Sequence, residues 1–584
     1  SGGYCVNHSP SAGPDFGNDP QHQIPLTGIN GGTVFSLYDQ EPFRSPDMGP
    51  LGVVLSTGEF QITVTDLEIP GRGFPLKIMR TYRSRRDGRF SLLGNNWTLN
   101  YDEYLTPGKW NDQGDYCDAV QWRMGNGFTE VWVNECHPDT VMGWRAFMGF
   151  FGKIRPLASG YQIRYPNGTV KTFGQQGRNG LNQPIWLLTR IEDRNGNFMT
   201  FTHDQAVRGL LSITDTLGRI ITLDYDADHR LESVTDFANR RIDYHYDDNG
   251  DLDWVKAPEV TTSPNHENDF CEVCGPSGCV PGPNCTGLRK TTSYTYLASY
   301  GCTDASMAHN LKTITDAKAN GASGTHVPFL TNTYYRPANA ETGCGTSGGT
   351  TGKPQDSIDT QNYGGGTVIY TYAVVAPPPS GGGGANDTTI QVKVTDRNQN
   401  KQVHSFNYQG NPLRIDYQDS NEVSQALETN VFVDNGPNDR PMLVSGRTES
   451  RGKNYLPTGE LDDYTTGMSE EIVYDNQNAD VFQRGNVKRI RRTPGDRGAD
   501  LQDEIITEYT YEPLFNQPVT IKDPRGHITK LTYDYQEGTY SQLITSPSAS
   551  VDPTWWSNGE ISNFMAVSGN ANLLDINGDG VAHG

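Results

Sequence analysis

The stretch Leu210-Leu-Ser-Ile-Thr-Asp-Thr-Leu-Gly-Arg219 decides the fold, because similar stretches precede and follow it at a nearly fixed distance. They are Leu188-Thr-Arg-Ile-Glu-Asp-Arg-Asn-Gly-Asn197 and Leu231-Glu-Ser-Val-Thr-Asp-Phe-Ala-Asn-Arg240. An apolar residue marks each copy in steps of 22, 21 and 21 residues, at Ile191, Ile213, Val234 and Val255. An aromatic–acid pair keeps the same spacing, at His203-Asp204, Tyr225-Asp226 and Tyr246-Asp247. Self-similarity at a fixed period indicates a repeat protein.

Each repeat has the pattern of one β-hairpin. The run Ile220-Ile-Thr-Leu-Asp-Tyr225 alternates apolar and polar side chains, as a strand with one buried face does. Asp247-Asp-Asn-Gly250 is a turn sequence in which Asn-Gly supplies positive φ angles. The run Leu231-Glu-Ser-Val-Thr235 returns along the sheet. Successive hairpins are therefore predicted to lie side by side.

Weaker copies of the repeat continue downstream, at residues 311–316, 392–415, 472–490 and 509–534. Gly (65 residues) and Pro (35 residues) are spread along all 584 positions and leave little room for long helices. We therefore predict an all-β fold with long loops and almost no helix. The tract Ala376-Pro-Pro-Pro-Ser-Gly-Gly-Gly-Gly384 is expected to be a flexible loop without site chemistry.

The charge and hydropathy of the chain exclude two classes of partner. Lys+Arg 47 against Asp+Glu 69 gives a net charge of −22. Nucleic acids and anionic membrane surfaces carry the same sign and would repel such a chain. No stretch approaches the roughly 18 consecutive apolar residues of a membrane helix. We predict no nucleic-acid partner and no membrane span.

Segments upstream of the repeats complete a recognisable pattern, in the order Leu55–Phe60, Thr65–Leu76, Arg80-Thr-Tyr-Arg-Ser84 and Gly94-Asn-Asn-Trp-Thr-Leu-Asn-Tyr101. Together with the Tyr-Asp pairs, they resemble the YD repeats of the Rhs family and the segment that precedes them in bacterial Rhs and wall-associated proteins. The resemblance covers about residues 45–550. It implies a hollow β-shell, or part of one, made of hairpins that spiral into one continuous sheet, as in Rhs toxins, in the C subunits of insecticidal toxin complexes and in teneurins. Both faces of such a one-layer sheet are expected to be partly wet.

One motif resembles the self-cleavage site of Rhs toxins but departs from it. Asp523-Pro-Arg-Gly526 begins in the same way, whereas Ile528-Thr-Lys-Leu-Thr-Tyr-Asp534 continues as an ordinary repeat. We therefore assign Asp523 to a turn, where an aspartate can bond to its own backbone.

The sequence divides into seven predicted segments. They are an N-terminal extension (1–45), an Rhs-type prefix (46–105), β-hairpins with Cys117 and Cys136 (106–180), regular YD repeats (181–260), a Cys-rich insert (261–302), degenerate repeats with long loops (303–550) and a C-terminal tail (551–584).

Nine cysteines point to covalent cross-links. The candidates for disulfides are Cys117, Cys136, Cys271, Cys274, Cys279, Cys285, Cys302 and Cys344. Cys117 with Cys136, and Cys302 with Cys344, are the expected pairs outside the insert. Inside it, the spacing Cys-x2-Cys also suits zinc, but the following Cys-x5-Cys fits a zinc ribbon badly, so disulfides are favoured over metal. Disulfides indicate an oxidising compartment, and we expect a secreted or cell-surface protein.

The tail carries a calcium-loop pattern. Asp575, Asn577 and Asp579 supply oxygen ligands at the first, third and fifth positions, and Gly580 permits the sharp turn at the sixth. The bidentate acid at position twelve would fall at 586, beyond the 584 residues. Calcium is the one cofactor that the sequence indicates, and a polar tail without a metal is the alternative.

Other constellations have structural explanations. Asp247-Asp248 and Asp462-Asp463 stand beside turn signals, and the histidines lack zinc-protease spacing. The basic run Lys488-Arg-Ile-Arg-Arg492 alternates along a strand and is expected to form an exposed face or to pair with neighbouring strands. We predict no catalytic residue and no enzymatic activity.

Three functional hypotheses follow. The first is a non-catalytic extracellular scaffold that encloses a polypeptide cargo or self-assembles. The second is a cell-surface adhesin that binds glycans or partner cells. The third is a processed shell fragment of a bacterial Rhs toxin with self-cleaving activity.

Overall fold

The fold is known from a computed structural model. It describes residues 26–27, 33–35, 50–84, 91–112, 115–134, 144–146, 153–165, 168–178, 184–204, 209–260, 272–275, 278–281, 288–302, 307–317, 327–336, 346–347, 356–375, 387–407, 410–432, 444–451, 468–475, 486–493, 504–512 and 517–533. Within these residues the secondary structure is strands, joined by turns and two short 3-10 segments, η2 (Pro50–Gly52) and η3 (Leu297–Tyr300). The predicted all-β fold is confirmed.

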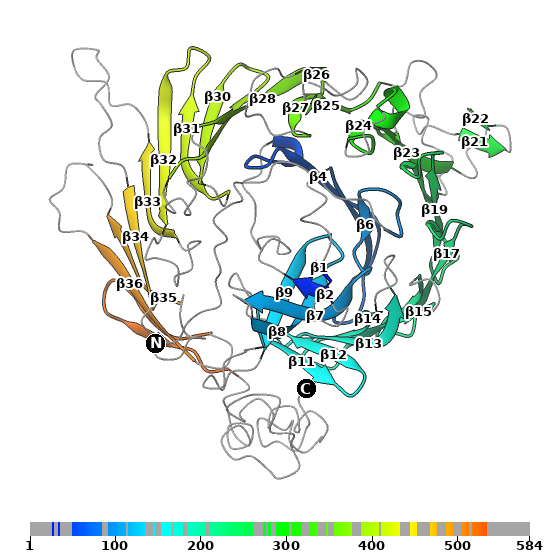
Figure 1. Cartoon of the computed structure of the whole chain (residues 1–584), viewed down its shortest axis with the longest axis horizontal. Helices are drawn as coiled ribbons and strands as arrows, with labels where there is room; N and C mark the ends of the chain where they lie inside the picture. The colour runs from blue at the N-terminus through cyan, green and yellow to red at the C-terminus, as the bar shows by residue number, and fades with distance from the viewer. Residues whose placement is uncertain are drawn as a thin grey trace, which may run out of the picture.

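Most strands belong to one long sheet that curves around the molecule (Figure 1). Its first strands are β7 (Tyr104–Asp112), β8 (Asp115–Arg123), β9 (Thr129–Asn134), β10 (Trp144–Ala146), β11 (Lys153–Leu157), β12 (Gly160–Arg164) and β13 (Val170–Arg178). β7 pairs with β8 and also with β14, so this part of the chain folds back on the sheet.

We call the next strands the early wall. They are β14 (Pro184–Glu192), β15 (Phe198–His203), β16 (Leu210–Thr214), β17 (Ile220–Tyr225), β18 (Leu231–Thr235), β19 (Arg241–Tyr246), β20 (Leu252–Val260), β23 (Leu288–Tyr296), β24 (Leu311–Thr315), β25 (Leu330–Arg336), β27 (Ile358–Tyr363), β28 (Gly366–Val374), β29 (Ile390–Thr395) and β30 (Lys401–Phe406). Each pairs antiparallel with the next, as the side-by-side hairpins predicted.

We call the last strands of the sheet the late wall. They are β31 (Pro412–Gln418), β32 (Ser424–Phe432), β33 (Val444–Arg451), β34 (Met468–Tyr474), β35 (Val487–Thr493), β36 (Ile505–Tyr511), β37 (Pro518–Lys522) and β38 (Ile528–Lys530). They continue the same antiparallel pairing. Small further strands are β1 (Leu26–Thr27), β2 (Thr33–Phe35), β26 (Thr346–Ser347) and the separate hairpin of β21 (Glu272–Gly275) with β22 (Gly278–Pro281).

A four-stranded N-terminal sheet lies inside the curve of the early wall (Figure 1). It consists of β3 (Val53–Val54), β4 (Glu59–Ile69), β5 (Leu76–Arg83) and β6 (Trp97–Leu99). Its apolar side chains and those of the early wall form one continuous hydrophobic core. The wall side chains in this core define its inner face, and they include Ile213, Leu223, Val234, Tyr244, Val255, Ile314 and Val392.

The expectation that both faces of the sheet are partly wet is wrong for the early wall. Alternate residues of β17 and β19 are exposed and buried, so one face meets water. The other face is buried, because the N-terminal sheet removes it from water. The sequence pattern of the repeats contains no signal for this second layer.

Within the described residues, the structure contains no helix with the length and apolarity needed to cross a bilayer.

Candidate functional site

The aspartate of each repeat closes the turn between two strands. Asp215 is typical: its Oδ1 accepts hydrogen bonds from the backbone N–H groups of Leu217 and Arg219, both at 2.9 Å. Its Oδ2 accepts a hydrogen bond of 2.7 Å from Nε of Arg219. Both carboxylate oxygens therefore stabilise a tight turn, as an aspartate side chain does in Asx turns. The same Oδ1 bonds occur at Asp193, Asp226, Asp236, Asp247, Asp396, Asp419 and Asp523.

The tyrosine of each repeat fastens one hairpin to the strand before it. Tyr246 Oη donates a 2.8 Å hydrogen bond to the carbonyl of Leu231, fifteen residues earlier. Tyr225 donates likewise to Leu210 at 2.9 Å, and a β-bulge precedes each of the two tyrosines. The Tyr-Asp pair thus has two structural tasks, a strand-to-strand bond and a turn. Equivalent bonds come from Tyr296, Tyr334 and Tyr533, and His203 Nε2 lies 2.6 Å from the carbonyl of Leu188.

Asp523 makes the contacts of an ordinary turn residue. Its Oδ1 accepts from the N–H groups of Arg525 and His527 at 2.9 and 2.8 Å, and its Oδ2 lies 3.1 Å from Nδ1 of His527. Burial works against the charged carboxylate, but the hydrogen bonds from His527 outweigh it and lower the pKa of Asp523. These contacts agree with the turn role expected for this residue.

A buried polar network joins the N-terminal sheet to the early wall. Arg80 Nε lies 3.0 and 2.8 Å from the two carboxylate oxygens of Asp66, which is also on the N-terminal sheet. Across the interface, Arg80 Nη2 donates to Tyr294 Oη at 2.8 Å, and Tyr244 Oη donates to Asp66 at 3.0 Å. Burial disfavours the charge of Arg80, but the field of Asp66 outweighs it and raises the pKa of the guanidinium.

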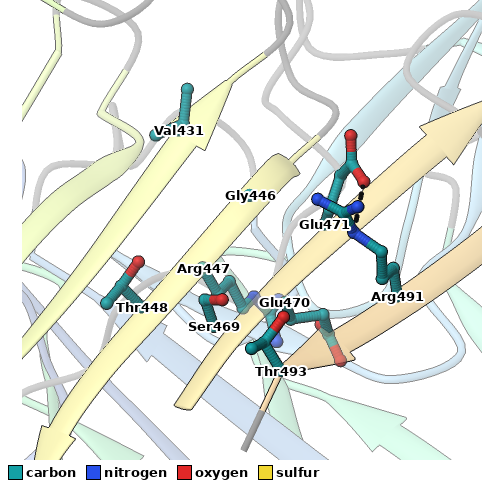
Figure 2. Close-up of a pocket in the computed structure, with 9 residues that line it drawn as sticks. All are labelled: Val431, Gly446, Arg447, Thr448, Ser469, Glu470, Glu471, Arg491 and Thr493. Carbon is teal, nitrogen blue, oxygen red and sulfur yellow. Dashed lines mark ion pairs between the residues drawn. The ribbon is translucent and has the colours of Figure 1, made fainter. Parts of the chain in front are cut away.

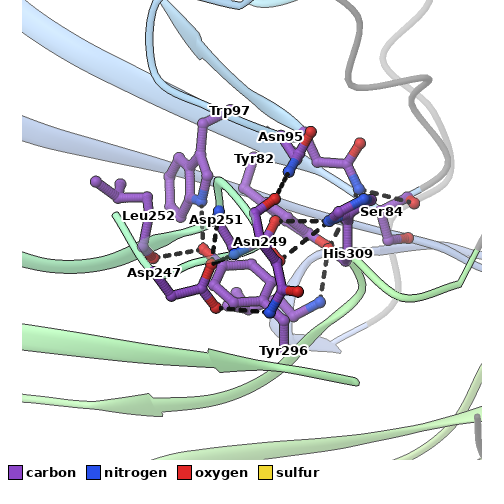
Figure 3. A network of polar contacts seen from close by, with 12 residues as sticks. Tyr82, Ser84, Asn95, Trp97, Asp247, Asn249, Asp251, Leu252, Tyr296 and His309 are labelled. Atoms are coloured by element: carbon purple, nitrogen blue, oxygen red, sulfur yellow. Dashed lines mark hydrogen bonds and ion pairs between the residues drawn. The ribbon is translucent and has the colours of Figure 1, made fainter. Parts of the chain in front are cut away.

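A second network lies along the same interface, which we call the seam (Figure 3). Trp97 Nε1 donates to Tyr296 Oη at 2.8 Å, and Tyr82 Oη donates to the carbonyl of His309 at 3.0 Å. At its edge, His309 Nδ1 lies 2.9 and 3.0 Å from the two carboxylate oxygens of Asp251. Trp97 and Tyr296 are 199 residues apart in sequence, and Tyr82 and His309 are 227 apart, so spacing along the chain gave no signal for these contacts.

The inner face continues from the early wall onto the late wall. Residues that pair across antiparallel strands place their side chains on the same face. Such pairs connect the buried Tyr370 with Ala426 on β32, by way of Val394, Gln402 and Tyr417. Asn430 lies four residues after Ala426 on the same strand and therefore on the same face. From Asn430, further pairs lead to Ile505 by way of Arg447, Glu470 and Arg492. Ile505 therefore lies on the inner face, yet it is 46% exposed. The described part of the N-terminal sheet packs on the early wall and leaves this surface open.

The outer face of the late wall carries a shallow pocket of about 130 Å³ (Figure 2). Its floor is at Gly446, between Val431 and the ion pair of Glu471 with Arg491, whose Oε2 and Nε are 3.0 Å apart. Thr448, Ser469 and Thr493 contribute hydroxyl groups to the lining, and Arg447 and Glu470 complete it.

The basic run of β35 is paired with neighbouring strands, which agrees with its predicted role. Arg492 Nε lies 2.7 Å from Glu470, and Arg491 Nη1 lies 3.3 Å from Glu504. Lys488 lies 4.0 Å from Asp475. The positive charges are thus distributed among carboxylates on both sides of the strand.

The predicted calcium ligands Asp575, Asn577 and Asp579 lie outside the described residues, and the calcium site stays a prediction. Among the residues that the structure describes, no group of three or more His, Cys, Asp or Glu side chains is placed to hold a metal ion.

The structure describes only some of the cysteines for which disulfides were predicted. Cys302 is buried and disulfide-bonded. In the hairpin of β21 and β22, the backbone register sets Cys274 opposite Cys279. Cys117 lies on β8, at a position where only the backbone is described. Cys136, Cys271, Cys285 and Cys344 lie outside the described residues, so the individual pairings stay predictions.

Comparisons with known families agree with this geometry. A domain of unknown function, DUF6531, matches residues 52–130, which include the whole N-terminal sheet. The RHS repeat matches residues 207–241, in the regular part of the early wall. A search of curated proteins finds no match.

A search of solved structures finds matches of low similarity. The complex TcdB2–TccC3 without its hypervariable C-terminal region has 11% identity and a TM-score of 0.25, over 79% of this chain and 27% of that one. The Tc holotoxin pore of Photorhabdus luminescens has 11% identity and a TM-score of 0.22, over 76% and 23%. The N-terminal domain of the effector SpvB from Salmonella typhimurium has 8% identity and a TM-score of 0.15, over 53% and 94%. The chain thus spans about a quarter of the length of the Tc structures.

A continuous sheet of hairpins with Tyr-Asp turns places the chain in the class of β-repeat proteins. The RHS match at residues 207–241 and the repeated Tyr and Asp contacts support the predicted resemblance to the Rhs/YD-repeat family.

Proposed function

We propose that this protein is a non-catalytic extracellular scaffold whose late wall holds a polypeptide cargo on its inner face. The observation that carries the proposal is the change in burial along a single face. The same face is part of the hydrophobic core at Tyr370 and Val392 and is half-exposed at Ile505. A sheet face that has a covering layer at one end and an apolar surface without one at the other is suited to receive a second layer.

The chemistry of this surface favours a polypeptide. Aliphatic and aromatic side chains of the inner face are partly exposed at Ile472, Ile490, Ile505, Tyr509 and Ile521. The charged Arg492 lies on the same face, and its side chain is 50% exposed. Apolar side chains among spaced charges match the mixed surface of another protein.

We propose a non-catalytic role because the conspicuous polar side chains make structural contacts. The conspicuous aspartates and tyrosines of the repeats hold turns and join strands, as at Asp215 and Tyr246. The buried Arg80 and Asp66 hold the N-terminal sheet in place. Each of these groups already has a structural task.

Two further parts of the proposal have separate support. The disulfide at Cys302 favours an oxidising, extracellular location. Self-assembly is the variant in which the last described strand, Ile528–Lys530, accepts a strand from another molecule, because strand edges offer unpaired backbone groups.

Photocrosslinking of the full chain tests the cargo proposal. A photoreactive residue replaces Ile505 on the inner face or, as a matched control, Val431, which is 50% exposed on the outer face. We expect defined crosslinked peptides from position 505 and none above background from position 431. Mass spectrometry then identifies whether these peptides belong to residues 534–584 of this chain or to another protein. Equal crosslinking at both positions, or none at position 505, would contradict the proposal.

Glycan binding is the second candidate, and the hydroxyl-lined pocket of Figure 2 favours it. A Cβ at Gly446 would lie 3.7 Å from the Glu470 carbonyl and 3.8 Å from Val431, so Gly446→Ala fills the pocket without a clash. Binding on a glycan array that Gly446→Ala abolishes would support an adhesin. An array on which the native chain binds nothing would remove this candidate.

A further inference from the structure

In the network of Figure 3, the hydrogen bonds between the N-terminal sheet and the early wall join neutral groups. On the N-terminal side, Asn95 donates its backbone N–H to the carbonyl of Gly250 at 3.3 Å. Tyr82 donates to the carbonyl of His309 and accepts from the backbone N–H of Leu311 at 2.8 Å. Bonds between neutral groups do not change with pH across the physiological range, so they give the seam a constant strength.

One contact at the seam is ionic. The Asp251 side chain is completely buried, and both of its carboxylate oxygens lie within 3.0 Å of Nδ1 of His309. The imidazole is 29% exposed and can exchange a proton with water. The carbonyl of His309 itself accepts the hydrogen bond from Tyr82, and the N–H of Leu311, two residues further on, donates to the same hydroxyl. A change in the charge of His309 is therefore transmitted to the backbone that anchors Tyr82.

The groups around the pair are acidic or neutral. Asp247, from the turn before β20, acts on both Asp251 and His309. From the segment before β27, Asp356 bonds to Asn310 and acts on Tyr82. Tyr82 and Tyr296 are themselves neutral at physiological pH, because burial raises the pKa of each well above its ordinary value. The imidazolium of His309 thus faces an acidic environment.

We propose that the Asp251–His309 pair is a pH-responsive lock that fastens the N-terminal sheet to the early wall. The lock is closed while His309 carries its proton and compensates the buried carboxylate. When His309 loses the proton, Asp251 is a buried anion without a compensating charge, and the seam opens locally. Separation at this edge would uncover part of the inner face of β20 and β24.

The direction of the pH dependence follows from both groups. The hydrogen bond to Asp251 raises the pKa of His309 above its ordinary 6.5. Its stabilising contribution is complete below that ordinary value and is lost as the pH rises through the raised value. Burial raises the pKa of Asp251, which also makes the folded seam bind protons more tightly. Both contributions are lost as the pH rises, that of Asp251 from 3.8 through its raised pKa and that of His309 above 6.5 through its raised pKa.

The chain offers a matched control. His245 Nδ1 lies 2.7 Å from Asp253, but their side chains are 53% and 30% exposed on the outer face of the wall. Water screens such a pair, and exposed ion pairs contribute little to stability. The chemistry is the same in both pairs, and only the lock pair is at the seam.

Hydrogen exchange of the full chain between pH 6 and 8.5, corrected for the intrinsic exchange rate, tests the lock. We expect protection at Leu311 and at residues 95–99 to fall about tenfold more than protection in β16 and β17, which corresponds to about 1.4 kcal/mol. His309→Gln, and separately Asp251→Asn, should remove this extra fall, whereas His245→Gln should leave it intact.

The inference is overturned if the native chain shows no extra fall, or if His309→Gln retains it. If His309→Gln does not fold, Asp251→Asn gives the same information, because an amide needs no compensating charge. The readout does not depend on any cargo.

Discussion

The early and late walls are built from the same repeat, but they differ in what covers them. In both, an aspartate closes the turn and a tyrosine bonds to the preceding strand, as at Asp236 and Tyr246 in one and Asp523 and Tyr533 in the other. Among the residues that the structure describes, a second layer lies on the inner face of the early wall only. The repeat therefore specifies the hairpin, and a separate sheet supplies the burial.

The largest expected difference in stability between the two walls comes from removing a charged side chain that is buried in one and half-exposed in the other. Arg80→Met leaves Asp66 without its partner in the core, and we expect a loss of about 3–5 kcal/mol in the free energy of unfolding. In the late wall, Arg492→Met breaks an ion pair with Glu470 in which the arginine side chain is half-exposed, and the loss should be about 1 kcal/mol or less. Urea denaturation measures both. Equal losses would mean that the N-terminal sheet does not bury Arg80.

Core packing gives the next difference. Ile213→Ala removes a fully buried side chain, and we expect a loss of about 2–5 kcal/mol. Ile505→Ala removes a half-exposed side chain of the same type on the same face, so the loss should be about 1 kcal/mol or less. The two variants are compared by the midpoint of chemical unfolding. A costly Ile505→Ala would show that the late wall is already covered.

The tyrosine bond provides a smaller effect. Tyr246→Phe removes a buried hydroxyl from the carbonyl of Leu231, at an expected cost of about 1 kcal/mol. Tyr533→Phe removes the equivalent bond to Pro518 where water can replace it, and should cost less. Thermal unfolding of both variants, with the native chain as reference, tests the order. The reverse order would contradict the assignment of the inner faces.

The turn aspartates should produce the smallest effect, in acid. Burial alone would raise the pKa of Asp236, but hydrogen bonds from Arg240 and Ala238 outweigh it and lower the pKa from 3.8. This stabilisation is present above the ordinary pKa and is lost as the pH falls through the lowered value. NMR titration should show lowered pKa values at both Asp236 and Asp523, because the turn is the same in both walls. A raised value at either position would break the equivalence.

The sequence predicted those features that repeat. The 21–22-residue step placed the strands around Ile213 and Val234, and the Tyr-Asp pairs marked residues that proved to be bonded. The turn role of Asp523 could also be inferred, because Ile528 and its neighbours continue the alternating pattern.

No pattern in the sequence indicated the contacts between residues that are far apart along the chain. Asp251 and His309 are 58 residues apart, and Arg80 and Tyr294 are 214 residues apart. Such pairs form because the sheet curves around the N-terminal strands, and this curvature is a property of the whole wall. For the same reason, the burial of the inner face of the early wall was not expected.

Electron cryomicroscopy of the full chain tests the central claim most directly. The account predicts a single curved antiparallel sheet, with residues 53–99 inside the arc of residues 184–406 and no part of residues 53–99 against residues 412–530. Separate compact globules, or a map in which the N-terminal sheet lies away from the early wall, would contradict it.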